Sequence, residues 1–184
     1  MTNSLEHIIH ALGVTLNGKI KTPIVVGGWA INLLGMPRTT LDFDFMIFED
    51  EFDVLASSLQ KLGYRQVIKT SLYARFQSEE NNILPYIDCL FADEGTYDKI
   101  VSSGKKVDLF GTEFILPTVL HIIAMKLHAV KHGEAHRFAK DYNDILALIE
   151  IHGLDTSPGS EFAEMCDKYA NREIYRRISN ATKK

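Results

Sequence analysis

The sequence has little cysteine and no pattern that would bind zinc through it. Only two cysteines occur in the 184 residues, Cys89 and Cys166, and neither belongs to a CxxC pair or a Cys/His cluster. Cys89 lies in an apolar run and is expected to be a small buried residue. No secretory leader pattern begins the sequence. These features predict a reduced, cytoplasmic protein.

Long hydrophobic runs and a surplus of basic charge are also missing. No apolar run approaches the ~20 residues needed to cross a bilayer, so no membrane association is expected. The formal net charge is -4 and the sequence pI is about 6.0, which counts against nucleic-acid binding by the chain as a whole. The net charge of the whole chain does not decide whether it has a local basic groove. The basic residues near the end of the chain are interpreted as a solvated helix end and tail: Arg172, Arg176, Arg177, Lys183 and Lys184.

Three common catalytic or nucleotide-binding motifs do not occur. The chain has no GxSxG elbow, no Walker A lysine loop and no GxGxxG turn, which removes most hydrolase, P-loop and dinucleotide-binding interpretations. What is present is ordinary globular composition, with 46% hydrophobic and 24% charged residues. This length suits one domain, or a small core with an appended helical piece.

Hydrophobic periodicity divides the chain at Pro117. Before it, strand and helix patterns alternate, and after it only helical patterns remain. We therefore predict an α/β (α+β) core over residues 1–116, with a mixed sheet flanked by helices, and a C-terminal helical segment over residues 117–184. Strands are expected at 23–26, 41–48, 64–69, 72–77, 83–91, 106–110 and 113–116. Helices are expected at 3–12, 29–34, 53–62, 96–103, 118–132 and 135–151, and one or two more over 161–179.

One strand carries two acidic residues in an apolar setting. Asp42 and Asp44 alternate with Leu41, Phe43 and Phe45, so both carboxylates should project from one side of the strand. Two neighbouring carboxylates repel each other. A hard divalent cation with oxygen ligands is the group that best keeps such a pair together, and Mg²⁺ fits best.

A glycine pair precedes this strand. Gly27 and Gly28 separate an expected strand from an expected helix, and glycine lets backbone N–H groups approach a phosphate closely. Arg38 and Thr40, just before the acidic strand, add donors for phosphate or base. A glycine pair alone is most often a simple turn, and Asp-x-Asp alone is most often a solvated strand edge. Their combination predicts a phosphate-binding turn beside a metal-binding strand.

The segment GGWAINLLGMPRTTLDFDF resembles the signature of the nucleotidyltransferase superfamily with the DNA polymerase β fold. It is most similar to the minimal bacterial members, which are AbiEii-type toxin nucleotidyltransferases and small lincosamide and aminoglycoside nucleotidyltransferases. The resemblance implies the nucleotidyltransferase fold and a site of three carboxylates. Asp88, in the strand pattern LPYIDCLF, matches the third. Its alternative interpretation is a strand-end aspartate that faces water.

The helical segment carries a weaker part of the resemblance. LPTVLHIIAMKLHAVKHG followed by FAKDYNDILAL is similar to the family's helical region, in which a lysine and an aspartate approach the nucleotide. The matching positions are Lys126 and Asp141. Ordinary helix-surface charges are the alternative for both.

The resemblance implies transfer of a nucleoside monophosphate from an NTP, ATP among them, to an acceptor. Two Mg²⁺ ions, or Mn²⁺ instead, would be held by Asp42, Asp44 and Asp88 while Gly27 and Gly28 hold phosphate. Three hypotheses stay open. The chain could be a toxin that modifies tRNA or a protein and has an antitoxin partner, an antibiotic-modifying enzyme, or an inactive nucleotide-binding module. A homo-oligomer also stays open. The three-carboxylate hypothesis requires Asp88 to share a sheet face with the other two aspartates.

Overall fold

The computed structural model describes residues 4–79, 84–133 and 135–182. The backbone contacts divide the chain into two compact units, each described below by itself. The sheet unit comprises Met1–Leu33 and Arg38–Pro117, and the helical unit comprises Leu34–Pro37 and Thr118–Lys184. The four residues 34–37 therefore belong to the helical unit, although they lie within the first quarter of the sequence.

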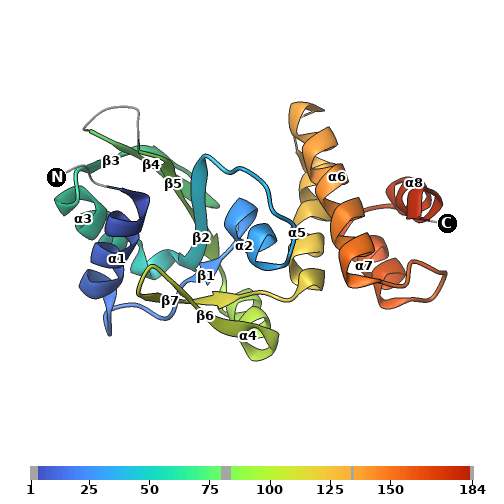
Figure 1. Ribbon diagram of the computed structural model, residues 1–184, viewed down its shortest axis with the longest axis horizontal. Helices are drawn as coiled ribbons and strands as arrows, with labels where there is room; N and C mark the ends of the chain where they lie inside the picture. Colours follow the sequence, from blue (N-terminus) through green and yellow to red (C-terminus); the bar gives the residue numbers. More distant parts are fainter. Residues whose placement is uncertain (1–3, 80–83, 134, 183–184) are drawn as a thin grey trace. The chain divides into compact units, whose positions relative to one another are not determined.

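The sheet unit contains all the strands that the structure describes, arranged in one seven-stranded sheet (Figure 1). The strand order is β3-β4-β5-β2-β1-β7-β6. The β2–β5 and β1–β7 pairs are parallel, and the other neighbours are antiparallel. The strands are β1 (Ile24–Val25), β2 (Asp42–Phe48), β3 (Tyr64–Lys69), β4 (Tyr73–Ser78), β5 (Tyr86–Ala92), β6 (Lys105–Leu109) and β7 (Thr112–Leu116).

Within the described residues of this unit, four α-helices accompany the sheet. They are α1 (Leu5–Leu16), α2 (Gly27–Leu33), α3 (Phe52–Lys61), which follows the 3-10 turn η1 (Glu49–Glu51), and α4 (Glu94–Ser103). Helices α1 and α3 lie side by side in Figure 1, α1 against β7 and α3 against β3. Helix α2 packs against β2. Helix α4 meets the far end of β2, where the Tyr97 ring centroid lies 4.5 Å from that of Phe48.

An aromatic core fills the sheet face beneath α1 and α3. Phe43 and Phe45 of β2 are fully buried, and both rings contact Phe114 of β7. On the same face the Phe52 ring of α3 meets Phe91 of β5 edge to face, with centroids 5.6 Å apart. Because side chains alternate along a strand, burial of the odd-numbered residues of β2 directs the even-numbered ones to the opposite face.

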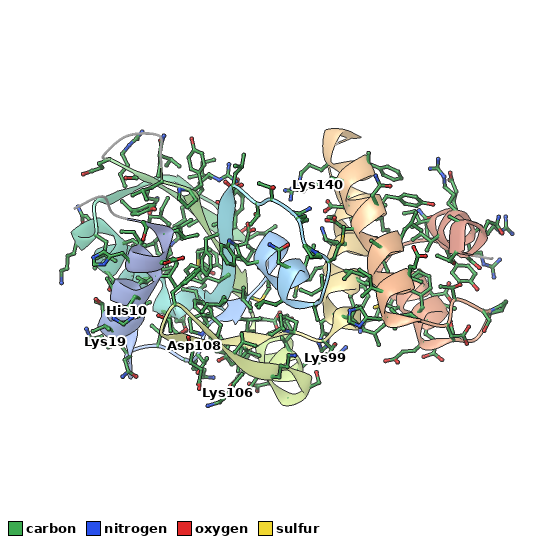
Figure 2. All side chains as sticks on the ribbon, viewed as in Figure 1. His10, Lys19, Lys99, Lys106, Asp108 and Lys140 are labelled. Carbon is green, nitrogen blue, oxygen red and sulfur yellow. The ribbon has the colours of Figure 1, made fainter. Side chains whose placement is uncertain are left out.

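The hairpin between β6 and β7 fixes helix α1 to the edge of the sheet. The hydroxyl of Thr112 donates to the Ile9 carbonyl at 2.9 Å, and Nδ1 of His10 lies 3.2 Å from the Phe110 carbonyl. Figure 2 shows His10 on α1 and, across from it, Asp108 on the hairpin. Asp108 accepts from the Gly111 N–H at 3.0 Å, which closes the turn.

The helical unit consists of four α-helices in the part of the chain that is described. They are α5 (Val119–His132), α6 (Ala135–His152), α7 (Glu161–Tyr169) and α8 (Arg172–Thr182). Helix α5 packs against α6 and α7, and α8 packs against α6 and α7. His152 Nε2 lies 2.9 Å from the Leu34 carbonyl, which ties the early segment 34–37 to this unit.

The observed elements confirm the predicted fold class, a mixed sheet flanked by helices. The structure differs from the sequence prediction mainly at element ends. Helix α1 continues to Leu16 and α8 continues to Thr182; of the one or two helices expected over residues 161–179, the structure has two. The break between them is explained by Asn171, whose Oδ1 accepts from the Ile174 N–H at 2.9 Å and so caps a new helix. None of the helices within the described ranges combines the length and the apolar composition needed to cross a bilayer.

Candidate active site

Strand β2 presents its two aspartates on the face opposite the aromatic core. Phe43 and Phe45 are buried, whereas Asp42 and Asp44 are half-buried. The aspartates and phenylalanines that alternate in the sequence therefore lie on opposite faces of the folded strand. The strand holds both carboxylates at the sheet surface on one side and anchors them through phenylalanines on the other.

The neighbouring parallel strand brings Asp88 to the same face. The register pairs Asp44 with Asp88 and Asp42 with Tyr86. Paired residues of adjacent strands point to one side of a sheet, so the three aspartates share it, as the three-carboxylate hypothesis requires. We call this side of the sheet the carboxylate face. Asp88 is also buried, so it is not the solvent-facing strand-end residue of the alternative interpretation.

Arg75 completes this face and is the residue that sequence reasoning missed. It lies on β4 and pairs in register with Asp88. Its Nε donates to Oδ1 of Asp88 at 2.7 Å and its Nη2 donates to Oδ2 at 2.6 Å, a two-pronged ion pair. Nη2 also lies 3.8 Å from Oδ2 of Asp42. The Arg75 guanidinium therefore bridges two of the three aspartates.

Electrostatics keep that guanidinium charged. The hydrogen bonds to Asp88 raise the pKa of Arg75 above its ordinary value, and the charges of Asp88 and Asp42 add to the rise. Burial works in the opposite direction but is the smaller effect. The only sequence signal for Arg75 was one basic residue in the strand pattern YARFQS, and that signal does not show which residue of β5 it faces.

The three aspartates suit a hard divalent cation in chemistry but are not arranged as a closed cage. Among the described residues, no group of three or more His, Cys, Asp or Glu side chains converges on one point as metal ligands do. Asp42 and Asp44 supply carboxylate oxygens, the donors that Mg²⁺ prefers. Asp88 has a third carboxylate, and each of its oxygens already accepts one hydrogen bond from Arg75. The donor set therefore fits the implied metal in its chemistry, although one of the three carboxylates is paired with Arg75.

The glycine pair lies directly beside this face because of how β1 pairs with β2. The Val26 N–H donates to the Asp44 carbonyl at 3.0 Å, so the next residue, Gly27, falls against the Asp44 side chain. Gly27 has a φ of 59°, which favours glycine, and a Cβ there would lie 2.1 Å from Oδ2 of Asp44. A Cβ on Gly28 would lie 2.5 Å from the hydroxyl of Thr40. Neither position has room for a side chain.

The loop that leads into β2 is held by hydrogen bonds from both sides. The Arg38 N–H donates to Oδ1 of Asn32 on α2 at 2.8 Å, and the Thr40 hydroxyl donates to the Asp42 carbonyl at 3.2 Å. Nη2 of Arg38 would lie 3.1 Å from a Cβ on Gly28. The structure thus gathers Gly27, Gly28, Arg38 and Thr40 next to the aspartate strand, as the motif predicted.

The two remaining predicted residues lie together in the helical unit. Nζ of Lys126 on α5 is 2.7 Å from Oδ1 of Asp141 and 2.6 Å from Oδ2 of Asp144, both on α6. The Lys126 side chain is 11% exposed and each aspartate side chain 4%. Lys126 and Asp141 are therefore not surface charges. Oδ2 of Asp141 has no hydrogen-bond partner among the described residues. Contact of Lys126 and Asp141 with a nucleotide stays a prediction.

No known family model matches the sequence, and no curated protein matches it. Solved structures do match the fold. The antibiotic-resistance factor ANT(2'')-Ia, in complex with adenylyl-2''-tobramycin, aligns with a TM-score of 0.58 and 15% identity, over 96% of this chain and 95% of that one. The lincosamide antibiotic adenylyltransferase LnuA, with lincomycin bound, aligns with a TM-score of 0.55 and 14% identity, over 82% and 99% of the two chains.

A third likeness is to an antigenic nucleotidyltransferase-like protein from Paracoccidioides brasiliensis. Its TM-score is 0.53 and its identity 17%, over all of this chain and 95% of that one. At such low identities the likeness establishes the fold. The chain has the fold of these nucleotidyltransferases, and this confirms the fold that the resemblance implied.

Proposed function

We propose that this protein is a metal-dependent nucleotidyltransferase that transfers a nucleoside monophosphate from an NTP to an acceptor. One observation supports the proposal most directly. Three aspartates from two adjacent strands share one sheet face beside Gly27 and Gly28, which we call the glycine corner, within a fold shared with nucleotidyltransferases. The proposed reaction is in-line attack of an acceptor hydroxyl or phosphate on the α-phosphorus, with release of pyrophosphate.

Each residue of the carboxylate face has a proposed role. Asp42 and Asp44 hold divalent cations, and Asp88 provides the third carboxylate and takes the proton of the acceptor. Mg²⁺ or Mn²⁺ bound there would offset the charge of the triphosphate and of the leaving pyrophosphate. Asp42 is more accessible than Asp88, because 37% of its side chain is exposed, compared with 11% for Asp88.

The glycine corner and its loop hold the triphosphate in this proposal. Gly27 and Gly28 lack side chains where a phosphate must approach the backbone, and the start of helix α2 favours negative charge. Arg38 neutralises the pyrophosphate, and Thr40 adds a hydroxyl donor. Lys126 and Asp141 are proposed as further nucleotide contacts, although their mutual ion pair supports a structural role equally well.

The acceptor is tRNA, a protein or a small molecule. Similarity in fold to two antibiotic-modifying adenylyltransferases makes aminoglycosides and lincosamides the first small molecules to test. A toxin that acts with an antitoxin partner, an inactive nucleotide-binding module and a homo-oligomer remain proposals from the sequence motif.

The test is a transfer assay with each α-labelled NTP, Mg²⁺ and cell extract, after which RNA, protein and small molecules are separated. We expect label in one fraction with the wild-type protein, and loss of that label in Asp42→Asn and Asp44→Asn. Asp50→Asn is the matched control, because Asp50 is an exposed carboxylate outside the carboxylate face. Full transfer by either site variant, or no transfer in any fraction by the wild-type protein, would contradict the proposal.

A further inference from the structure

The carboxylate face already contains a cation of the protein's own. Three carboxylates lie close together on the paired strands β2 and β5, and their negative charges repel one another. The Arg75 guanidinium, paired with both oxygens of Asp88 and 3.8 Å from Asp42, offsets that repulsion. A bound divalent cation would perform the same task, so Arg75 and the metal are alternatives for part of one site.

We propose that Arg75 is the resident counter-ion of the carboxylate face, and that a divalent cation gains Asp88 as a ligand only by displacing this guanidinium. The inference rests on the proposed function, because it concerns the same aspartates. Arg75 is a positioning residue in this account. It holds Asp88 in place and sets how tightly the metal binds, without contacting the reacting atoms.

The geometry supports competition between the guanidinium and the metal. The guanidinium donates separately to both oxygens of Asp88, so one lone pair of each oxygen is already taken and a metal that leaves the guanidinium in place must bind beside it. A divalent cation at Asp88 would also lie within a few ångströms of a fixed positive charge, which opposes its binding. The Asp88 side chain is only 11% exposed, so water screens this repulsion less than it would at an open surface.

The guanidinium has a second contact besides the aspartates. The Arg75 side chain is 33% exposed, so part of it borders solvent. Its Cζ lies 5.0 Å from the ring centroid of Tyr86, a residue on the same strand and face as Asp88. A cation near the face of an aromatic ring is attracted by the ring. Arg75 can therefore release Asp88 and keep its contact with the Tyr86 ring.

The competing explanation is that Arg75 simply braces β4 against β5. The two explanations differ in the sign of one effect. Removal of a structural brace leaves metal affinity unchanged or lowers it, because Asp88 becomes less well placed. Removal of a competing cation raises metal affinity, because three negative charges then act on the metal without an internal rival.

The experiment measures Mn²⁺ binding to the metal-free full-length protein, using the electron paramagnetic resonance signal of free Mn²⁺. We expect Arg75→Gln to bind Mn²⁺ roughly tenfold more tightly than the wild-type protein, since one nearby positive charge is removed. Arg65→Gln is the matched control, because Arg65 lies on the adjacent β3 strand and donates to Gln77 instead. We expect its Mn²⁺ affinity to equal that of the wild-type protein.

A second variant keeps the test decisive if Arg75→Gln does not fold. Arg75→Lys keeps the charge but loses the two-pronged geometry, and we expect a smaller gain in Mn²⁺ affinity. The gain should also depend on Asp88. In an Asp88→Asn background the Arg75→Lys substitution should change Mn²⁺ affinity much less.

The outcomes separate this inference from the proposed function. Tighter Mn²⁺ binding that depends on Asp88 supports the counter-ion role. If the wild-type protein binds Mn²⁺ and the folded Arg75 variants bind it equally or more weakly, the counter-ion role is wrong and the proposed function stands. If neither the wild-type protein nor the variants bind Mn²⁺, both are overturned.

Discussion

Replacing Lys126 with methionine separates a structural role for the buried trio from a role in nucleotide binding. Lys126 is the cation between Asp141 and Asp144, and all three side chains are nearly inaccessible to water. Lys126→Met keeps much of the length and volume of the side chain but removes the ammonium group that contacts both carboxylates. Loss of one partner from a buried ion pair destabilises the fold.

The size of the effect follows from this burial. Removing one partner of a buried ion pair costs about 3–5 kcal/mol. For chains of this length, each kcal/mol lowers the melting temperature by about 2–4 °C, so Lys126→Met should melt roughly 6–20 °C lower. Surface substitutions usually change stability by less than about 0.5 kcal/mol. Lys131→Met, an exposed change on the same helix, is therefore a suitable control.

The assay is thermal unfolding followed by circular dichroism, with hydrogen exchange measured separately for α5 and α6. We expect Lys126→Met to lose amide protection in both helices, whereas Lys131→Met keeps it. Equal melting temperatures for the two variants would refute the structural role. A Lys126→Met protein that is as stable as the control but needs far more NTP for half-maximal transfer would instead support a direct nucleotide contact.

Three further predictions concern the sheet unit. Gly27→Ala should destabilise the protein more than Gly18→Ala in urea unfolding, because both glycines have positive φ but only Gly27 also faces a side chain, that of Asp44; equal losses would contradict this. Hydrogen bonds from the start of α4 lower the pKa of Asp93 in the folded protein. The ionised carboxylate should therefore stabilise the fold above its ordinary pKa of 3.8, and this stabilisation should disappear as pH falls through the lower pKa of the folded state; Asp93→Ala should abolish this pH dependence of stability in acid titrations. Burial raises the pKa of the Cys89 thiol, so iodoacetamide at pH 8 should label it only after denaturation.

The local features of the site could be predicted from the sequence because they follow from short-range rules. The alternation of Asp42 and Asp44 with phenylalanines defines both the strand and the shared face of the carboxylates. The glycine pair marks the turn into α2, whose first residue, Gly27, has positive φ. Asp88 was located through the family resemblance, since alternation alone does not indicate which distant strand lies beside β2.

The features that could not be predicted depend on pairing between distant segments. Arg75 meets Asp88 only because β4 and β5 pair in one particular register, and a shift of one residue would direct it to the other face. The role of Asp144 depends on how α5 packs against α6, because only that packing brings it to Lys126. The assignment of residues 34–37 to the helical unit also depends on contacts remote in sequence.

The central claim is that Asp42 and Asp44 bind the metal that carries the nucleotide's phosphates. The most direct measurement is an anomalous-scattering map from crystals of the full-length protein grown with Mn²⁺ and a non-hydrolysable NTP analogue. We predict a Mn²⁺ peak coordinated by both carboxylates, with the triphosphate against Gly27 and Gly28. An ordered nucleotide elsewhere, or a carboxylate face without Mn²⁺ at saturating concentration, would contradict the account.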